Sequence, residues 1–269
     1  MTFKIEFSYL TNPGKVRPNN EDNALVDAEL ELAIVADGMG GHKSGEMASA
    51  MAVKITKEKY ESMHYTGLKP NPYIDNLSLE ANQLLFAAQL ANSVIYETGN
   101  ASAENKGMGT TLTAALLNKN RLSVIHIGDS RLYVLRDDAL QQLTEDHSLV
   151  MDHVKKGIMT MEQAEKSPLQ NILTRALGTQ KKPQIDAFEF EIKERDRIIL
   201  CTDGLFKTTS DEKMKEILGQ NSDNLKACET MVETANINGG PDNVTVAIGR
   251  VLKKHWKEKI KTMFRKSYA

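Results

Sequence analysis

The sequence predicts an α+β fold, because its short strand-like runs occur in neighbouring pairs and its helical stretches are grouped between those pairs. The clearest pair, 111–117 and 122–127, is joined by Asn118-Lys-Asn-Arg121, a connection typical of a β-hairpin. Hairpin-like pairs favour antiparallel sheets over the strand–helix alternation of a parallel sheet. The 269 residues contain no internal repeat and no low-complexity linker. One main domain is therefore expected.

The individual elements follow from hydrophobic periodicity and from turn residues. Strands are expected at 3–9, 24–27, 31–36, 111–117, 122–127, 131–136, 185–191, 197–202 and 244–251. Helices are expected at 45–61, 77–97, 147–155, 161–166, 168–174, 211–218 and 223–236. The helix over 77–97 has the strongest pattern, because apolar residues from Leu77 to Ile95 recur at helical spacing after a polar start. Residues 62–76, with two prolines and a glycine, are expected to form a loop.

Composition and cysteine usage narrow the class of protein. Apolar residues make up 41% and charged residues 26% of the chain, as in ordinary globular domains. No uninterrupted apolar run approaches the roughly 20 residues of a membrane span. The N-terminus alternates like a strand and lacks the apolar core of a signal peptide. Cys201 lies in a strand-like run and Cys228 in a helical one, which forms neither a disulfide framework nor a zinc site. A cytoplasmic protein is expected.

Charge is distributed unevenly along the chain. The net charge is −2, yet residues 253–269 carry seven Lys/Arg and one acid, a net +6, so residues 1–252 carry −8. An acidic body argues against nucleic-acid binding. In the tail 253–269, apolar residues such as Trp256 and Phe264 recur at helical spacing among lysines. This basic amphipathic pattern is consistent with docking on an anionic membrane surface, on an acidic partner, or on the body of the same chain.

Four aspartates lie where apolar, strand-like runs meet glycine-marked turns. Asp37 and Asp203 each follow such a run and precede a glycine, Asp129 follows Gly128, and Asp242 precedes the run 244–248. A single Asp-Gly is usually only a turn, so it is the joint occurrence that carries the signal. Carboxylates gathered at strand ends repel one another unless a cation lies between them. Hard divalent ions, Mg²⁺ or Mn²⁺, are the usual partners of such oxygen ligands.

Two neighbouring patterns suggest phosphate chemistry to different degrees. The stretch Asp37-Gly-Met-Gly-Gly-His-Lys-Ser44 resembles a P-loop, but a P-loop needs glycine directly before Lys-Ser, and His42 stands there. Arg17 offers a planar fork suited to two bonds with phosphate oxygens. The alternative for Arg17 is a surface ion pair with Glu21 or Asp22.

These motifs together give the chain a resemblance to the protein phosphatase 2C family, the PPM-type metal-dependent serine/threonine phosphatases, in its bacterial form. The matching stretches keep the order of the family and cover about residues 3 to 251. They are Val16–Asp22, Asp37–His42 with Gly45-Glu46, Gly107–Leu112, Gly128–Tyr133, Leu143–Ser148, Leu173–Gly178, Cys201–Leu205 and Gly239–Thr245. The resemblance implies a phosphatase domain at 1–252, built as a sandwich of two antiparallel sheets flanked by helices, a four-layer αββα arrangement, with 253–269 as a separate tail.

The resemblance also implies a role for each matching residue. Two Mn²⁺ or Mg²⁺ ions are expected, bridged by Asp37. The remaining expected contacts are the Gly38 carbonyl on one ion, Asp203 and Asp242 on the other, Asp129 with Asp203 at a third, weaker site, Glu21 and Asp22 through water, and Arg17 on the substrate phosphate.

Two positions depart from the family pattern. Met39 stands where eukaryotic relatives have a histidine proposed as the general acid, and a thioether cannot donate a proton. A metal-bound water, or His42 as a weaker candidate, is left for that role. The mobile flap of the family, here about 147–172, often ends in His-Pro-basic-Asn, whereas this chain has Ser167-Pro-Leu-Gln-Asn171.

The expected function is metal-dependent hydrolysis of phosphoserine and phosphothreonine in proteins, in which water activated by two metal ions attacks phosphorus. The expected partners are phosphorylated proteins and a bacterial Ser/Thr kinase whose action the enzyme reverses. Two alternatives share this fold: a catalytically inactive binding module, and an anti-sigma-type regulatory phosphatase. All four aspartates are present, which favours an active enzyme over the inactive module.

Overall fold

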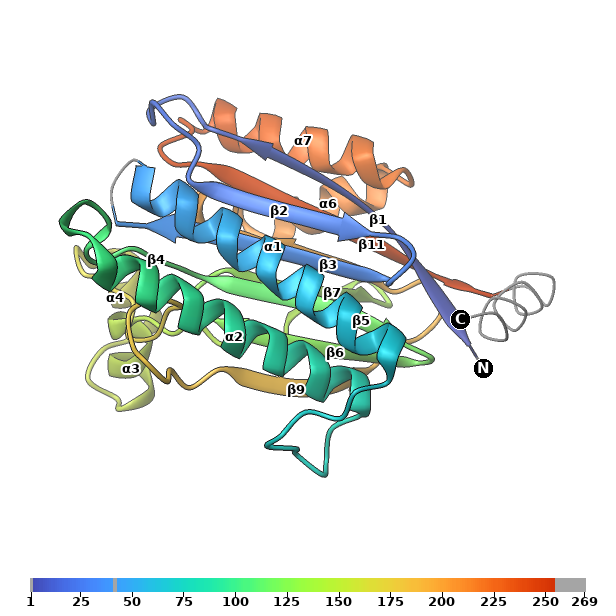
Figure 1. The fold of residues 1–269 in the computed structure, drawn as a ribbon. Helices are drawn as coiled ribbons and strands as arrows, with labels where there is room; N and C mark the ends of the chain where they lie inside the picture. Colours follow the sequence, from blue (N-terminus) through green and yellow to red (C-terminus); the bar gives the residue numbers. More distant parts are fainter. Residues whose placement is uncertain (1, 41–42, 255–269) are drawn as a thin grey trace.

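The computed structural model, which describes residues 2–40 and 43–254, has four layers. Two antiparallel sheets pack face to face, and helices cover the outer face of each sheet (Figure 1). This arrangement confirms the expected α+β sandwich. His42 and the tail residues 255–269 lie outside the described residues.

Each sheet combines pairs of consecutive strands with strands that lie far apart in the sequence. The first sheet has the order β1 (Phe3–Asn12), β11 (Val244–Lys253), β10 (Arg197–Cys201), β7 (Arg131–Arg136) and β8 (Ala139–Gln142). The second has the order β2 (Asp22–Asp27), β3 (Leu32–Met39), β5 (Leu112–Asn118), β6 (Arg121–Ile127) and β9 (Asp186–Glu191), with β4 (Gly109–Thr110) paired to β3. The last strand thus lies between the first strand and β10, which joins both ends of the described chain to one sheet.

Helices pack on the outer faces of both sheets. The long pair α1 (Lys43–Thr66) and α2 (Leu79–Ala101) covers the second sheet, and the pair α6 (Asp211–Gln220) and α7 (Asn224–Ile237) covers the first. The shorter helices are η1 (Ala103–Asn105), α3 (Leu149–Lys155), α4 (Met161–Glu165) and α5 (Asp203–Phe206). Side-chain caps mark several helix starts: Ser78 accepts a hydrogen bond from the backbone of Ala81 at the start of α2.

Three hydrophobic clusters separate the four layers. The central cluster lies between the sheets and contains Ile5, Val35, Leu122 and Leu200. The two outer clusters lie under α1 and α2 on one side and under α6 and α7 on the other. The central strands β3, β5, β6 and β10 therefore bury both faces, which explains why runs such as 32–36 are apolar throughout rather than alternating.

Sequence and structure differ at a few elements. Residues 168–174 are not helical, because Leu149 donates its backbone N–H to the Ile172 carbonyl and Thr174 donates to the His147 carbonyl, which pairs this stretch with 147–149. The predicted loop at 62–76 begins later, since α1 continues to Thr66. Strands β4 and β8 were not predicted, because both are very short and β8 is half exposed.

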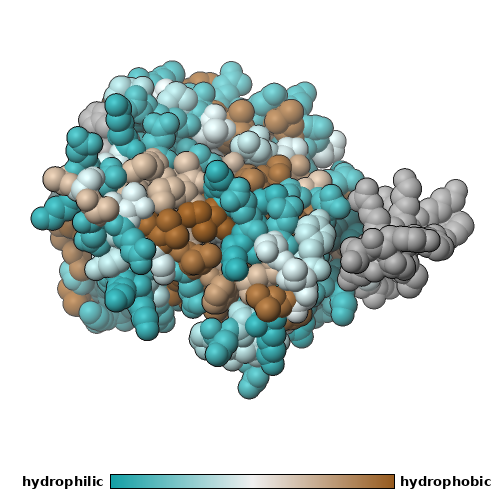
Figure 2. Space-filling view, viewed as in Figure 1, coloured by the Kyte–Doolittle hydropathy of each residue, from teal (hydrophilic) through white to brown (hydrophobic). Residues whose placement is uncertain are grey.

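The outer surface is mixed in character. Figure 2 shows hydrophilic residues over most of the face on which α1 and α2 lie, with a small hydrophobic area near its middle. Among the described residues, no helix has both the length and the apolar character needed to cross a membrane.

Replacing Leu122 by alanine tests the central cluster. The Leu122 side chain is fully buried between the sheets, so Leu122→Ala should lower the free energy of unfolding by about 2–5 kcal/mol through lost burial and an unfilled cavity. The matched variant Leu225→Ala removes an exposed leucine of α7 and should change it by less than about 0.5 kcal/mol. Urea unfolding measures both. Equal effects of the two variants would contradict the packing described here.

Candidate active site

All four predicted aspartates line one pocket at an end of the sandwich. The pocket has a volume of about 250 Å³. Its lining consists of Arg17, Glu21, Asp37, Gly38, Met39, Gly40, Thr111, Asp129, Asn171, Leu173, Asp203, Asp242 and Asn243. The residues come from seven separate stretches of the chain, so the pocket exists only when both sheets are assembled.

Each aspartate is held at the end of a strand or in the turn beside it. Asp37 lies within β3 itself, because the strand continues to Met39 instead of turning directly after the aspartate. Its backbone N–H donates to Thr111 Oγ1 at 2.8 Å, and its carbonyl accepts from Thr110 Oγ1 at 2.8 Å. Asp203 is the first residue of α5. The backbone around these carboxylates is therefore firmly fixed.

Asp129 and Asp242 lie in connections next to strands, and both line the pocket. Asp129 lies in the turn between β6 and β7 and is buried. Asp242 lies directly before β11, and its Oδ1 accepts a hydrogen bond from the backbone N–H of Asn243 at 2.9 Å. The pocket thus receives carboxylates from both sheets.

Two glycines allow the start of α1 to approach β3. A Cβ atom on Gly38 would collide with the carbonyl oxygen of Gly45, and a Cβ atom on Gly45 would collide with the carboxylate of Glu21. Only glycine permits backbones to come this close. The approach brings the Glu21 side chain to the wall of the pocket.

Asp22 lies behind the pocket, next to Asp37 in the β2–β3 ladder. Its Oδ2 accepts hydrogen bonds from Thr202 Oγ1 at 2.8 Å and from Thr245 Oγ1 at 2.7 Å, while its buried Oδ1 has no hydrogen-bond partner. Burial raises the pKa of Asp22 to about 7, and the charges of Asp203 and Asp242 add to the rise although both threonines oppose it.

The carboxylates in the pocket also disfavour one another's charged form. Burial, followed by the charges of Asp22 and Asp203, raises the pKa of Asp37 well above its usual value. Burial and the charge of Asp203 raise the pKa of Asp129 to about 7, against the opposing charge of Lys207. The site therefore holds more negative charge than the protein compensates.

Two basic side chains already face the cluster. Lys207 Nζ lies 2.6 Å from Asp203 Oδ2. Arg17 forms a two-pronged ion pair with Asp242, with both N···O distances at 2.9 Å. Within the described ranges 2–40 and 43–254, no three His, Cys, Asp or Glu side chains already surround a common point, in keeping with carboxylates that are turned toward these cations.

The donor set suits hard divalent ions. The pocket supplies carboxylate and carbonyl oxygens, which Mg²⁺ and Mn²⁺ prefer over the nitrogen and sulfur ligands of zinc sites. Asp22 Oδ1 and Asp203 Oδ1 are buried and accept no hydrogen bond in the described structure. Because a buried carboxylate oxygen without a partner is costly, the site fits the expected metal ions.

Several residues of the site were not predicted from the sequence. Asn243 donates to the carbonyls of Pro13 and Asn19 and accepts from the backbone N–H of Glu21, so it holds the loop that carries Arg17. Thr202 and Thr245 fix Asp22. Thr202 and Asn243 are each adjacent to a predicted aspartate, and Thr245 lies in the same motif as Asp242. This proximity in the sequence was the signal that could have pointed to them.

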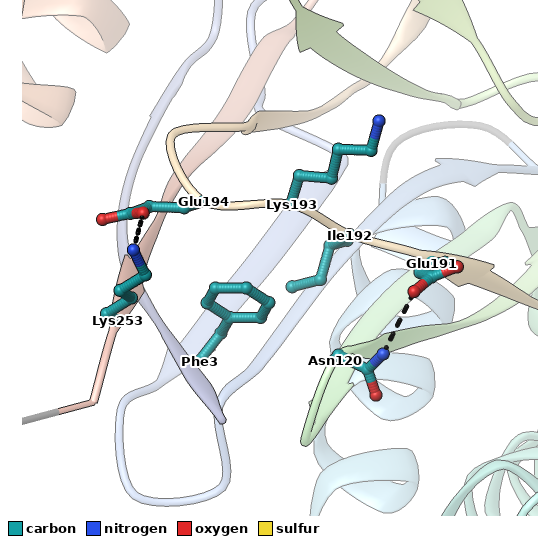
Figure 3. Close-up of a pocket in the computed structure, with 7 residues that line it drawn as sticks. All are labelled: Phe3, Asn120, Glu191, Ile192, Lys193, Glu194 and Lys253. Atoms are coloured by element: carbon teal, nitrogen blue, oxygen red, sulfur yellow. Dashed lines mark hydrogen bonds and ion pairs between the residues drawn. The ribbon is translucent and has the colours of Figure 1, made fainter. Parts of the chain in front are cut away.

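His42 is outside the described residues, whereas Met39 lines the pocket. A second hollow, of about 380 Å³, lies at the opposite end of β11, between Phe3, Glu194 and Lys253 (Figure 3). Phe3 and Ile192 form its apolar floor, and the ion pair of Glu194 with Lys253 crosses its rim. None of the predicted aspartates takes part in it.

Binding of Mn²⁺ should release protons below neutral pH. Asp22 and Asp129 keep protons up to about pH 7 in the metal-free site, and a divalent ion has to displace them. Mn²⁺ affinity should therefore rise with pH through the range in which these protons are lost. Calorimetry at pH 6 in two buffers of different ionisation enthalpy should give at least about one proton released per protein, and fewer at pH 8. Proton release that is absent at pH 6 would contradict the assigned charge state.

Comparison with known proteins shows which family the chain resembles in sequence. The model of the protein phosphatase 2C family matches residues 18–237. The chain is 35% identical over 243 residues to the serine/threonine phosphatase stp of Listeria innocua, covering 89% of this chain and 93% of the relative. It is 37% identical over 253 residues to the serine/threonine protein phosphatase PstP of Mycobacterium tuberculosis, covering 94% of this chain and 46% of that longer protein.

Solved structures agree with the sequence relatives. A crystal structure of the Mycobacterium tuberculosis phosphatase PstP superposes with a TM-score of 0.80 at 36% identity, covering 93% of this chain and 99% of that one. A crystal structure of the catalytic domain of PstP in complex with two manganese ions superposes with a TM-score of 0.78 at 35% identity, covering 94% and 100%. With the sandwich, the ordered motifs and the four aspartates of the pocket, these matches establish that the chain belongs to the protein phosphatase 2C family.

Proposed function

We propose that this pocket is the active site of a metal-dependent protein serine/threonine phosphatase, in which the four aspartates hold the ions and Arg17 holds the substrate phosphate. The observation that carries the proposal is the convergence of Asp37, Asp129, Asp203 and Asp242 on one pocket, with excess negative charge and an oxygen-only donor set. Membership of the phosphatase family and a relative's complex with two manganese ions support it.

Each carboxylate has a distinct part in this proposal. Asp37 would serve as a ligand of two Mn²⁺ or Mg²⁺ ions, with the Gly38 carbonyl as a ligand of one of them and Asp203 and Asp242 as ligands of the other. Asp129 and Asp203 would hold a third, weaker ion. Glu21 and Asp22 act through water: Glu21 from the pocket wall, and Asp22 from behind Asp37. When bound, the ions supply an activated water and neutralise charge on the phosphoryl group.

Arg17 binds and orients the phosphate. Its guanidinium is half exposed at the mouth of the pocket and now pairs with Asp242. Because Asp242 is also a proposed metal ligand, Arg17 can exchange that carboxylate for a phosphate oxygen with little movement of its side chain. A planar fork suits two bonds to phosphate, which lysine could not provide in the same geometry.

The proton for the leaving hydroxyl has two proposed sources. Met39 lines the pocket where a histidine would be needed for direct donation, and a thioether holds no proton to give. Water at the ions is the favoured donor. His42 remains the second candidate, and it lies outside the described residues.

The setting of the enzyme is also part of the proposal. Its substrates are phosphorylated proteins, and it reverses a bacterial Ser/Thr kinase in the cytoplasm. Cys201 and Cys228 are both free and buried, which suits a reducing compartment. The 253–269 segment is proposed to contact a membrane surface or an acidic partner, as its basic amphipathic pattern suggests. Its first two lysines already pair with the body, with Glu194 and Glu31 respectively.

Activity should depend on the bridging aspartate and on divalent ions. Asp37→Asn should lower kcat/KM for a phosphothreonine peptide by at least about a hundredfold, because the ions contribute several kcal/mol to the transition state. Asp75→Asn, which changes an exposed loop aspartate, should leave activity unchanged. Excess EDTA should abolish the activity of the unmodified chain, and Mn²⁺ should restore it. Full activity in EDTA would refute the metal-dependent mechanism.

Loss of Arg17 should lower kcat/KM for the phosphorylated substrate without weakening the binding of metal ions. Arg17→Ala should cost roughly 1.5–3 kcal/mol in kcat/KM, about tenfold to a hundredfold, since one charge-assisted contact is lost. Mn²⁺ binding should be kept or become tighter, because Asp242 loses a competing partner. Arg121→Ala, at an exposed arginine of β6, is the matched control. Wild-type kinetics for Arg17→Ala would reduce Arg17 to a surface ion-pair residue.

A further inference from the structure

Lys207 connects the carboxylate cluster to the 147–172 segment, whose Asn171 lines the pocket. Its Nζ donates to Asp203 Oδ2 at 2.6 Å and to Asn171 Oδ1 at 2.6 Å. Asp203 begins α5 and Lys207 directly follows that helix, so the side chain returns along one helical turn to the carboxylate. Asn171 belongs to the 147–172 segment, which includes α3 and α4.

The ammonium of Lys207 is bonded to Asp203, and the charges of two further carboxylates of the pocket also act on it. The charges of Asp203, Asp129 and Asp37 all raise its pKa, while burial lowers it. Its charge in turn opposes the rise in the pKa of Asp129. Lys207 therefore provides positive charge at Asp203, one of the two carboxylates proposed above to hold the weaker third ion.

The hydrogen bond with Asn171 reaches the end of the 147–172 segment. The end of the 147–172 segment is fixed to its beginning by the pairing of Ile172 with Leu149. Asn171 and the neighbouring Leu173 line the pocket. The Lys207–Asn171 hydrogen bond thus joins the rim of the pocket to the same carboxylate that serves the ions.

We propose that Lys207 is a positioning residue that takes the place of a cation at Asp203 and tethers Asn171, so that a divalent ion binding between Asp129 and Asp203 competes with Lys207 and loosens residues 167–172. The proposal rests on the metal site assigned under the proposed function. It adds a coupling between occupation of that site by an ion and the position of residues 167–172.

The competition follows from charge and from the flexibility of lysine. A divalent ion carries twice the charge of an ammonium group. When it binds the Asp203 carboxylate, whether at the unpartnered Oδ1 or at Oδ2, it repels the ammonium held on Oδ2. The four-carbon stem of Lys207 allows the ammonium to withdraw without backbone movement. Because coupling between two binding events is reciprocal, whatever holds Lys207 on Asn171 must weaken the ion by the same factor as the ion weakens the tether.

The Lys207 pair differs from the surface ion pairs of the protein. Lys213 and Glu216 pair at 2.9 Å, but their side chains are 45% and 49% exposed. Lys207 and Asp203 are 26% and 11% exposed, so solvent screens their interaction much less. Lys213 accordingly offers a matched position at which a lysine can be removed without affecting the pocket.

The test combines Mn²⁺ binding with hydrogen exchange on the full chain. Free Mn²⁺ is followed by electron paramagnetic resonance during titration of the unmodified protein and of Lys207→Met, Lys207→Arg, Asn171→Ala and Lys213→Met. Backbone hydrogen exchange of residues 167–172 is measured for each protein without Mn²⁺ and at saturation. Circular dichroism and thermal unfolding verify that every variant is folded.

Lys207→Met should bind its weakest Mn²⁺ about tenfold more tightly, the effect of removing one charge-assisted hydrogen bond. Its residues 167–172 should exchange fast without Mn²⁺ and no faster with it. In the unmodified protein, exchange should accelerate on filling the weak site, and Lys207→Arg should preserve that response. Asn171→Ala should speed exchange while tightening Mn²⁺ less than Lys207→Met does, and Lys213→Met should match the unmodified protein.

Unchanged Mn²⁺ affinity in folded Lys207→Met, or exchange at 167–172 that is insensitive to both Lys207 and Mn²⁺, would overturn the proposal. If the unmodified protein binds two or more Mn²⁺ ions while Lys207→Met behaves identically, only the role of Lys207 fails. If the unmodified protein binds no Mn²⁺, the proposed metal site and the role of Lys207 fail together.

Discussion

The structure depends on one electrostatic constraint, which is that several carboxylates are held close together in a partly buried pocket. Asp37, Asp129 and the underlying Asp22 all have raised pKa values, chiefly because burial removes water and because neighbouring aspartates add negative charge. In water such groups would separate. Here the strands that carry them are fixed by hydrogen bonds and by packing between two sheets, so the repulsion has to be relieved by positive charge rather than by movement.

The sandwich is what brings the carboxylates together. Asp22 and Asp37 are neighbours in one sheet, whereas Asp203 and Asp242 come from the strand ends of the other. The threonine hydroxyls that bond Asp22 lie 180 and 223 residues further along the chain. Arg17 and Lys207 relieve part of the charge, and each engages a carboxylate that is also a proposed ligand. Arg17 therefore connects the proposed metal site with phosphate binding, and Lys207 connects it with the 147–172 segment.

The fold and the aspartates could be predicted from the sequence because their signals are local. An apolar run followed by Asp-Gly is visible at Asp37 and Asp203 without any knowledge of the partner strand. The roles of Thr202, Asn243 and Lys207 could not be predicted, because each depends on which distant segment lies beside it. The helix predicted at 168–174 was wrong for a similar reason: its backbone pairs with 147–149, and this tertiary contact outweighed local preference. His42 and the tail beyond Lys254 lie outside the described residues, so expectations for them stay predictions.

The most direct measurement is anomalous diffraction from crystals of the full chain grown with Mn²⁺. The account predicts at least two manganese peaks in the pocket, both in contact with Asp37. One should also contact the Gly38 carbonyl, and the other should also contact Asp203 and Asp242. It also predicts that Arg17 turns from Asp242 toward the open mouth of the pocket. Peaks that lie only outside the pocket, or a pocket that contains no manganese at saturating concentration, would contradict the account.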